Sequence, residues 1–289
     1  MTPPPFRRIL LAIDSSPAAR AATAVIGHLA APAQLEVVVL HVWNMQTRIR
    51  GGRWDIETAT EARLLVDEVV ADLKAAGVKA SGEIVNAADE KVGLAIERAA
   101  TELGADLVAV GSRGLSDLAG AFKGSISHRL IADVDCPVLV SPAGPARTQS
   151  IRRILVAVSH QSESGPLTDL AVAISKSVGG TIHVLHVLAP PRIAGEYTFL
   201  EPIEEAQATV DGAVERIRAA GAKVSGEVKI GSLSVAHEIV EVARTWDADL
   251  IIAGSRHHKD LAALIVGATE HDLIREAGRP ILIAARPTE

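Results

Sequence analysis

The segment Gly111–Ser125 has residue types and a spacing suited to holding an anion. Two residues separate Gly111 from Gly114, and nine separate Gly114 from the pair Gly124-Ser125. Glycines let backbone N–H groups approach phosphate oxygens closely, because no Cβ stands in the way. Gly124-Ser125 also lies where a helical pattern begins, so its amides and hydroxyl would meet a phosphate at a helix N-terminus. A plain strand-to-helix connection with a serine cap is the alternative.

Alternating strands and helices surround this segment. In the first half we expect strands near 8–13, 35–42, 79–86, 106–110 and 137–141, and helices near 17–31, 57–76, 88–103 and 125–133. The strands are mostly continuous apolar runs, which is typical of a sheet covered on both faces. Five strands joined by four crossover helices predict a doubly wound parallel α/β domain, Rossmann-like with a flavodoxin-like strand order. If strands 1 and 4 are neighbours, Asp14-Ser15-Ser16 after strand 1 faces the glycine loop after strand 4.

The chain repeats itself with a period near 144 residues. Arg7–Ile13, for example, recurs as Arg152–Val158. A period of this length indicates a duplicated domain rather than a short solenoid unit. We therefore expect two tandem domains of the same fold, 1–143 and 150–289, joined by a linker around 141–150 that contains Pro, Gly and Ser.

Taken together, these features resemble the universal stress protein family in its tandem two-domain form. The nucleotide-binding members of that family carry Gly, two residues, Gly, nine residues, Gly and then Ser or Thr, as the glycine loop does here. The first half also has the aspartate that ends strand 1, the His-Val that ends strand 2 and the Pro-Val that opens strand 5: Asp14, His41-Val42 and Pro137-Val138. The resemblance covers essentially all 289 residues.

The resemblance implies that the first half binds ATP, together with Mg²⁺ or Mn²⁺ held largely by phosphates and water. Val42 would contact the adenine, Asp14 would lie beside the adenosine or a metal-linked water, and Ala12 would line the pocket. The contacts to ribose and phosphates are implied for Gly111, Arg113, Gly114, Gly124, Ser125, Ile126 and Ser127. No residue is assigned a catalytic or metal-ligating role.

The second half departs from this pattern where the ligand would be bound. Ser159, His257 and Ala268 stand where the first half has an aspartate, a glycine and a serine. Hydrogen bonds to a charged ligand contribute roughly 1.5–3 kcal/mol each, so we expect the second half to bind ATP weakly or not at all. A rearranged loop that uses Thr269, or a protonated His257 that attracts phosphate, is the alternative.

Enzyme motifs are missing around the glycine loop. Phe122-Lys123-Gly124-Ser125 is not a P-loop, because its lysine precedes the glycine, and no nucleophile–base pair is evident beside it. We interpret the chain as an ATP-binding, nucleotide-sensing regulator of the stress response with unidentified protein partners. A slow ATPase or nucleotidyl-transfer enzyme, and a scaffold with ATP as structural cofactor, are the alternatives.

Composition argues against other classes of protein. The formal net charge is −6 and no block of Lys and Arg stands out, which argues against nucleic acid or an anionic membrane as partner. No apolar run approaches the ~20 residues that span a bilayer. The single cysteine, Cys136, is expected to be a small buried hydrophobe and fits a reducing compartment, so we expect a cytoplasmic protein.

The histidines are expected to be structural. His183 and His186 are three residues apart on one predicted strand, so they point to opposite faces and cannot share a metal ion. His41 and His186 are expected to satisfy polar groups at strand ends. His257-His258 has no cysteine nearby, so we expect no metal site there.

Two further segments could make contacts outside the nucleotide site. Trp43–Trp54 holds three arginines and two of the three tryptophans, which predicts a lid over the nucleotide, a partner-binding surface, or only an irregular surface loop. The apolar fifth strands, Pro137–Val140 and Pro280–Ile283, are predicted sheet edges. We expect them to associate within one chain as an internal pseudo-dimer; a homodimer of whole chains is left open.

Overall fold

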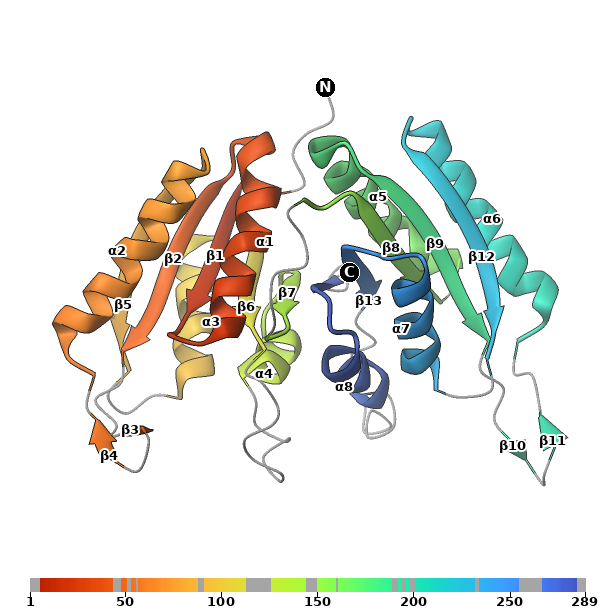
Figure 1. The fold of residues 1–289 in the computed structure, drawn as a ribbon. Coiled ribbons are helices and arrows are strands. Elements are labelled where there is room, and N and C mark those ends of the chain that lie inside the picture. The colour runs from red at the N-terminus through yellow and green to blue at the C-terminus, as the bar shows by residue number, and fades with distance from the viewer. Residues whose placement is uncertain are drawn as a thin grey trace. The chain divides into compact units, whose positions relative to one another are not determined.

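The computed structural model describes residues 6–43, 48–50, 53–55, 57–87, 91–112, 126–143, 150–159, 161–188, 192–193, 196–197, 201–231, 234–254 and 267–284. The chain divides into two compact units, Phe6–Ala146 and Arg147–Glu289. Each unit contains a parallel five-stranded sheet with helices on both faces (Figure 1). None of the described helices is both long and apolar enough to cross a membrane.

The first unit follows the predicted alternation closely. Its main strands are β1 (Arg8–Ile13), β2 (Glu36–Trp43), β5 (Lys79–Asn86), β6 (Leu107–Gly111) and β7 (Val138–Ser141). Its helices are α1 (Pro17–Ala33), α2 (Ala59–Ala75), α3 (Val92–Leu103) and α4 (Ile126–Asp133). A small antiparallel hairpin, β3 (Arg48–Arg50) and β4 (Arg53–Asp55), follows β2.

The second unit repeats these elements in the same order. Its main strands are β8 (Arg153–Val158), β9 (Thr181–Leu188), β12 (Lys223–Ile230), β13 (Leu250–Gly254) and β14 (Ile281–Ala284). Its helices are α5 (Gln161–Val178), α6 (Ile203–Ala219), α7 (Val235–Thr245) and α8 (Gly267–Glu276). The hairpin of β10 (Arg192–Ile193) and β11 (Glu196–Tyr197) follows β9 as β3 and β4 follow β2.

The strand order confirms the predicted fold class. It is β5-β2-β1-β6-β7 in the first unit and β12-β9-β8-β13-β14 in the second. Numbered by their place among the main strands, these orders are both 3-2-1-4-5, so the order reverses between strands 1 and 4. The predicted neighbours β1 and β6 are paired, with Ala12 beside Val110. Such a reversal opens a crevice beyond the carboxyl ends of the two strands.

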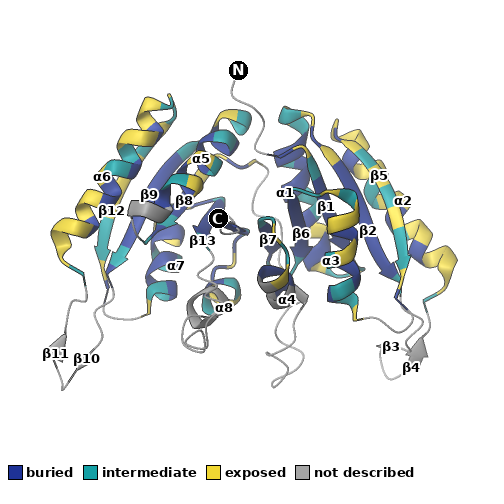
Figure 2. Cartoon of the chain, turned by 180° about the vertical axis from the view of Figure 1, so that it is seen from behind, coloured by how far each residue is buried: buried dark blue, intermediate teal, exposed yellow. Residues whose placement is uncertain are grey.

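Aliphatic side chains form the core of each unit, as the low aromatic content requires. In the first unit α1 and α2 pack on one face of the sheet, and α3 and α4 pack on the other (Figure 1). Ile9, Leu10 and Leu11 of β1 are fully buried between these layers. Figure 2 shows the central strands as buried, whereas the outer side of α2 is exposed. Burial on both faces explains why these strands are continuous apolar runs.

The outer strands β5 and β12 share the sequence Ser-Gly-Glu, at 81–83 and 225–227, and its glycine has a packing cause. Gly82 in β5 lies under α2, and a Cβ there would stand 2.3 Å from Cγ1 of Val66. At Gly226 in β12, a Cβ would stand 2.8 Å from methyl groups of Val210 and Val214 in α6. Glycine therefore lets each helix approach its outer strand closely.

The hairpin after β2 was not among the predicted elements. Arg48, Ile49 and Arg50 pair with Asp55, Trp54 and Arg53. The sequence contains Gly51-Gly52 between the two strands, a dipeptide typical of tight hairpins, inside a stretch interpreted as a loop. The residues 44–47, 51–52 and 56 lie outside the described part, so the predicted lid or partner surface stays a prediction.

Candidate functional site

Three of the predicted ligand-binding residues lie at one edge of the first sheet. Asp14 directly follows β1, Val42 is the penultimate residue of β2, and Gly111 ends β6. Because β1 is paired in parallel with both β2 and β6, the carboxyl ends of the three strands are adjacent. This is the edge at which doubly wound sheets bind their ligands.

The strand register separates the residues at this edge by face. Ala12 pairs with Leu40, and Ile13 pairs with His41. Because side chains alternate along a strand, Ala12 and Val42 share one face of the sheet, while Ile13 and His41 lie on the other. Ala12 and Val42 keep 8% and 6% of their surface exposed. They therefore form a nearly buried apolar floor at the carboxyl edge.

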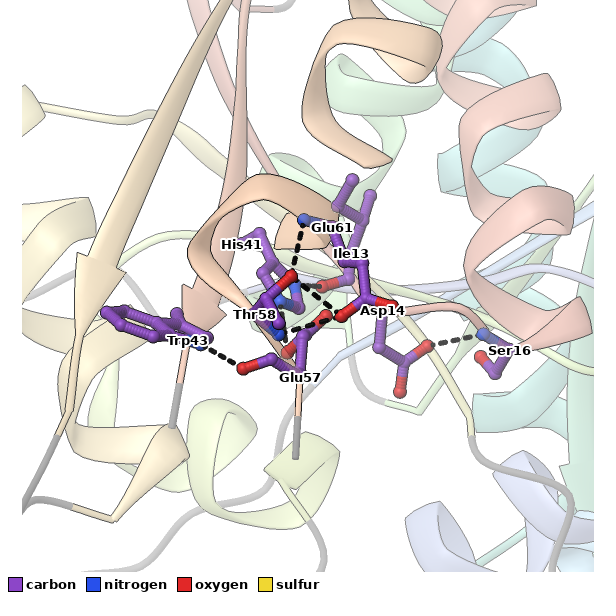
Figure 3. Close-up of polar contacts among 8 residues, drawn as sticks. All are labelled: Ile13, Asp14, Ser16, His41, Trp43, Glu57, Thr58 and Glu61. Carbon is purple, nitrogen blue, oxygen red and sulfur yellow. Dashed lines mark hydrogen bonds and ion pairs between the residues drawn. The ribbon is translucent and has the colours of Figure 1, made fainter. Parts of the chain in front are cut away.

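Asp14 is held by the start of α1. Its Oδ1 accepts a hydrogen bond from the backbone N–H of Ser16 at 3.0 Å (Figure 3). Ser16 in turn is the N-cap of α1, because its Oγ accepts from the N–H of Ala19 at 3.2 Å, and Pro17 opens the helix. Such a turn fixes the direction of the aspartate side chain.

His41 lies under the same edge, on the opposite face from Val42. Its ring is 1% exposed, with Nδ1 3.0 Å from the carbonyl oxygen of Ile13 and Nε2 3.1 Å from Oε2 of Glu57 (Figure 3). The indole Nε1 of Trp43 donates to the carbonyl oxygen of Glu57 at 3.0 Å. His41 thus satisfies a polar group at the end of β1, as predicted, but its bond to Glu57 was not foreseen.

Glu57 belongs to the segment that leads into α2. The next residue, Thr58, is the N-cap of that helix and forms a capping box with Glu61. His41 and Glu57 therefore join the end of β1, the end of β2 and the start of α2. The sequence contained one signal for this arrangement, the capping box pattern of Thr58 and Glu61, which marks where Glu57 must stand.

Gly111 has a structural role besides the predicted one. A Cβ at this position would stand 2.5–2.8 Å from atoms of Ala18 and Ala19 at the start of α1. Glycine at the end of β6 is thus required by the packing of α1 on the sheet. That its backbone also contacts a nucleotide stays a prediction.

The phosphate-binding part of the predicted site is described only at its end. Arg113, Gly114, Gly124 and Ser125 lie outside the described residues. Ile126 begins α4, and Ser127 in the first turn of that helix is buried. The first turn of a helix presents N–H groups without helical partners and a partial positive charge, both of which favour an anion.

The second unit has the same strands and helices around this edge, but other residues occupy several of the predicted binding positions. Ser159 follows β8 at the position that Asp14 has after β1. His186 corresponds to His41, and its Nε2 lies 3.0 Å from Oε2 of Glu201, which precedes α6. The Nδ1 of His186 is buried and has no hydrogen-bond partner among the described residues. His257 lies outside the described residues, and Ala268 is in the first turn of α8.

His183 and His186 lie on opposite faces of β9, as predicted. His183 bonds through Nδ1 to Oγ of Ser225 at 2.8 Å and through Nε2 to Oε1 of Glu227 at 3.2 Å, and its ring stacks on Trp246. The described residues contain no group of three or more His, Cys, Asp and Glu that could hold a metal ion. His257-His258 lies outside that part.

Comparison with known proteins agrees with this fold. The model of the universal stress protein family matches residues 5–142 and 150–285. The chain is 31% identical over 148 residues to universal stress protein YxiE of Bacillus subtilis, covering 47% of this chain and 98% of that protein. A universal stress protein of Thermus aquaticus is 32% identical over 135 residues, with the same coverages of 47% and 98%.

A solved structure matches over both units. The crystal structure of a universal stress protein from Archaeoglobus fulgidus has a TM-score of 0.74 at 22% identity, covering 98% of this chain and 97% of that one. The fold and the strand-edge site define a tandem doubly wound α/β protein. The chain belongs to the universal stress protein family, with one match of the family model in each half.

Proposed function

We propose that the first unit binds ATP with Mg²⁺ or Mn²⁺, and that the chain is a nucleotide-sensing regulator in the stress response. One observation carries the proposal: Ala12, Asp14 and Val42 lie together at the carboxyl edge where the strand order reverses. The glycine spacing of 111–125, which matches the nucleotide-binding members of the family, follows the neighbouring strand.

The described residues have the chemistry that an adenine nucleotide needs. Ala12 and Val42 offer an apolar surface of the kind that ligand sites use for a flat ring. The carboxylate of Asp14 can accept a hydrogen bond from a ribose hydroxyl or from a metal-bound water. The first turn of α4 offers N–H donors to phosphate. A bound Mg²⁺ or Mn²⁺ would neutralise part of the phosphate charge.

The proposal is one of binding rather than rapid turnover. Hydrolysis of ATP requires a group that orients or deprotonates the attacking water. His41 stands next to Val42 in the chain, but it lies on the opposite face and is bonded to Ile13 and Glu57. Release of many phosphates per chain by the purified protein with Mg-ATP would contradict the binding role in favour of the slow ATPase.

Calorimetric titration with ATP tests the proposal. We expect one site per chain, with affinity reduced about 100-fold or more by Gly114→Val, since the branched side chain would occupy space needed by phosphate. His257→Val, at the matching position of the second unit, is the control and should leave the affinity unchanged. Wild-type affinity in Gly114→Val at unchanged thermal stability would refute the phosphate site, and two equivalent sites would refute the asymmetry.

We also propose that β7 and β14 associate within one chain as an internal pseudo-dimer. Within its own unit each of these strands has one neighbour, β6 and β13 respectively. All four residues of each strand are buried and mostly aliphatic. Apolar sheet edges are normally covered or paired, which supports the proposal.

A further inference from the structure

We propose that His41 and Glu57 together hold one proton more than a neutral imidazole and a carboxylate, and that this protonated pair keeps the strand ends in the geometry that binds nucleotide. The first statement concerns the unliganded protein alone. The second rests on the proposed function. His41 is thereby a positioning residue, because it reaches the site through Ile13 rather than by touching the ligand.

The hydrogen-bond pattern of His41 requires two donors. Nδ1 lies 3.0 Å from the carbonyl oxygen of Ile13, and Nε2 lies 3.1 Å from Oε2 of Glu57. A carbonyl oxygen only accepts, and so does an ionised carboxylate, whereas a neutral imidazole has a single N–H. Both contacts become hydrogen bonds only when one proton is added, either on the ring or on Glu57, which then donates to Nε2.

Because the pair is buried, the loss of the added proton would leave one of the two hydrogen bonds of His41 unmade. The side chain of His41 is 1% exposed and that of Glu57 is 16% exposed, so water can do little to replace a lost bond. Glu57 is also held through its backbone, since its carbonyl oxygen accepts from Trp43 and the next residue caps α2. The backbone of Glu57 is therefore fixed at the start of that helix, which keeps its carboxylate within reach of His41.

The described acidic groups beside the pair also favour the added proton, while the side chains of the intervening hairpin, 48–55, lie outside the described part. Asp14 follows Ile13 at the end of β1, and Glu61 lies in the first turn of α2 beside Thr58 (Figure 3). On β5 the register partner of His41 is the apolar Ile84. The buried residues of α2 and α3, the helices that pack on β2, are apolar: Ala62, Val66, Leu73, Gly93, Ala95, Ile96, Ala99 and Ala100.

The second unit has a corresponding pair, His186 and Glu201, whose contact does not require an added proton. The Nε2 of His186 faces Oε2 of Glu201 at 3.0 Å, but its buried Nδ1 has no partner within the part of the chain that the structure describes. One N–H, on Nε2, is enough for that arrangement. The two His–Glu pairs therefore differ by one proton when each makes the hydrogen bonds that its geometry offers.

The added proton affects the candidate site because the residues it links are direct chain neighbours of predicted binding residues. Ile13 immediately precedes Asp14, and Val42 immediately follows His41. Loss of the proton weakens the link between the ends of β1 and β2, and with it the spacing of Asp14 and Val42. Because the binding-competent form holds the proton, ATP affinity falls as the pH rises and the pair becomes deprotonated.

The protonation state is measured by NMR on the unliganded full chain, with ¹⁵N-labelled histidine and ¹³C-labelled glutamate carboxyls. His41→Gln and His186→Gln assign the two rings. Near pH 7 we expect either two protonated nitrogens on His41 or a protonated Glu57 carboxyl, and one protonated nitrogen on His186. A singly protonated His41 ring beside an ionised Glu57 at that pH would overturn the assignment.

The link to binding is measured by ATP titration between about pH 6 and about pH 9. Affinity of the wild type should fall by up to about tenfold per pH unit once the pair loses its proton. In Glu57→Gln the amide can donate to Nε2 of a neutral ring, so its affinity should lose this pH dependence. The matched control Glu201→Gln should follow the wild type.

The possible failures are distinguishable. Equal pH profiles for wild type and Glu57→Gln would overturn the link between proton and affinity. ATP binding at no pH, together with the extra proton in the NMR data, would overturn the proposed function and leave the assignment of the proton standing.

Discussion

Gly111 and Ala18 are so close that a Cβ on Gly111 would stand 2.5 Å from the carbonyl carbon of Ala18 and 2.6 Å from the amide nitrogen of Ala19. Gly254, the counterpart in β13, has the methyl Cδ1 of Leu167 as its nearest such neighbour at 3.4 Å. The first neighbours are backbone atoms of a helix, while the second is the mobile end of a side chain. The backbone of α1 therefore leaves no room for a side chain at Gly111, whereas a side chain at Gly254 would meet only a methyl group that can move.

Alanine substitution should reveal this difference. Gly111→Ala must push the start of α1 away from β6, so we expect a loss of about 3 kcal/mol in the free energy of unfolding. Gly254→Ala should change it by less than about 0.5 kcal/mol. Urea unfolding of the full chain, followed by circular dichroism, measures both. Equal and small effects would show that α1 shifts without strain.

The contact between Gly82 and Val66 predicts a coupling between two substitutions. Gly82→Ala should destabilise the protein by about 1–3 kcal/mol, because the new methyl overlaps Cγ1 of Val66. Val66→Ala alone should also destabilise it, by leaving a cavity under α2. In the double variant the methyl introduced by Gly82→Ala enters that cavity, so the loss should be smaller than the sum. An additive result in a double-mutant cycle would contradict this packing.

The fold could be predicted from the sequence because its signals are local. Continuous apolar runs mark the buried strands, and the helices between them have the helical period. The hairpin at 48–55 was missed because its strands are short and one of them carries two arginines, although Gly51-Gly52 announced a tight turn.

The site could be predicted only in part. Ala12, Asp14 and Val42 were assigned through the family resemblance, and the strand register places them at one edge. The bond of His41 to Glu57 joins residues that are 16 apart in the chain, with the hairpin between them. The capping box of Thr58 and Glu61 indicates where Glu57 stands, but nothing in the local sequence indicates that its carboxylate faces His41. The packing of Gly111 on Ala18 could not be predicted either, because it joins residues far apart in the chain and depends on how α1 lies on the sheet.

Cys136 should be a poorly reactive thiol. Cys136 is only partly buried, and not fully buried as the sequence predicted. This partial burial, together with the negative charges of Asp106 and Asp135, raises the pKa of the Cys136 thiol from 9.0 to about 11. A rise of this size lowers the thiolate fraction near pH 8 by about 100-fold, and only the thiolate reacts. Alkylation by iodoacetamide, followed by mass spectrometry, should therefore be slow in the folded protein and fast in urea. Equal rates in both would contradict the raised pKa.

The hydrogen bonds of β7 define which of its amides face β6. The carbonyl oxygens of Pro137 and Ser141 accept from N–H groups of the β6 segment. Because N–H and C=O groups of one residue point to the same side in a parallel strand, Val138 and Val140 point away from β6. Their amides are the groups that association with β14 would protect.

Hydrogen exchange of the full chain, followed by NMR, tests this association. We expect the amides of Val138 and Val140 to exchange about 100-fold or more slowly than those of Gly82 and Ile84, which point away from β2 on the outer strand β5. The comparison is matched, because both pairs lie on an outer strand of the same sheet. Fast exchange at Val138 and Val140 at several protein concentrations would refute the internal pseudo-dimer. Protection that appears only as the concentration rises would assign the pairing to two chains instead of one.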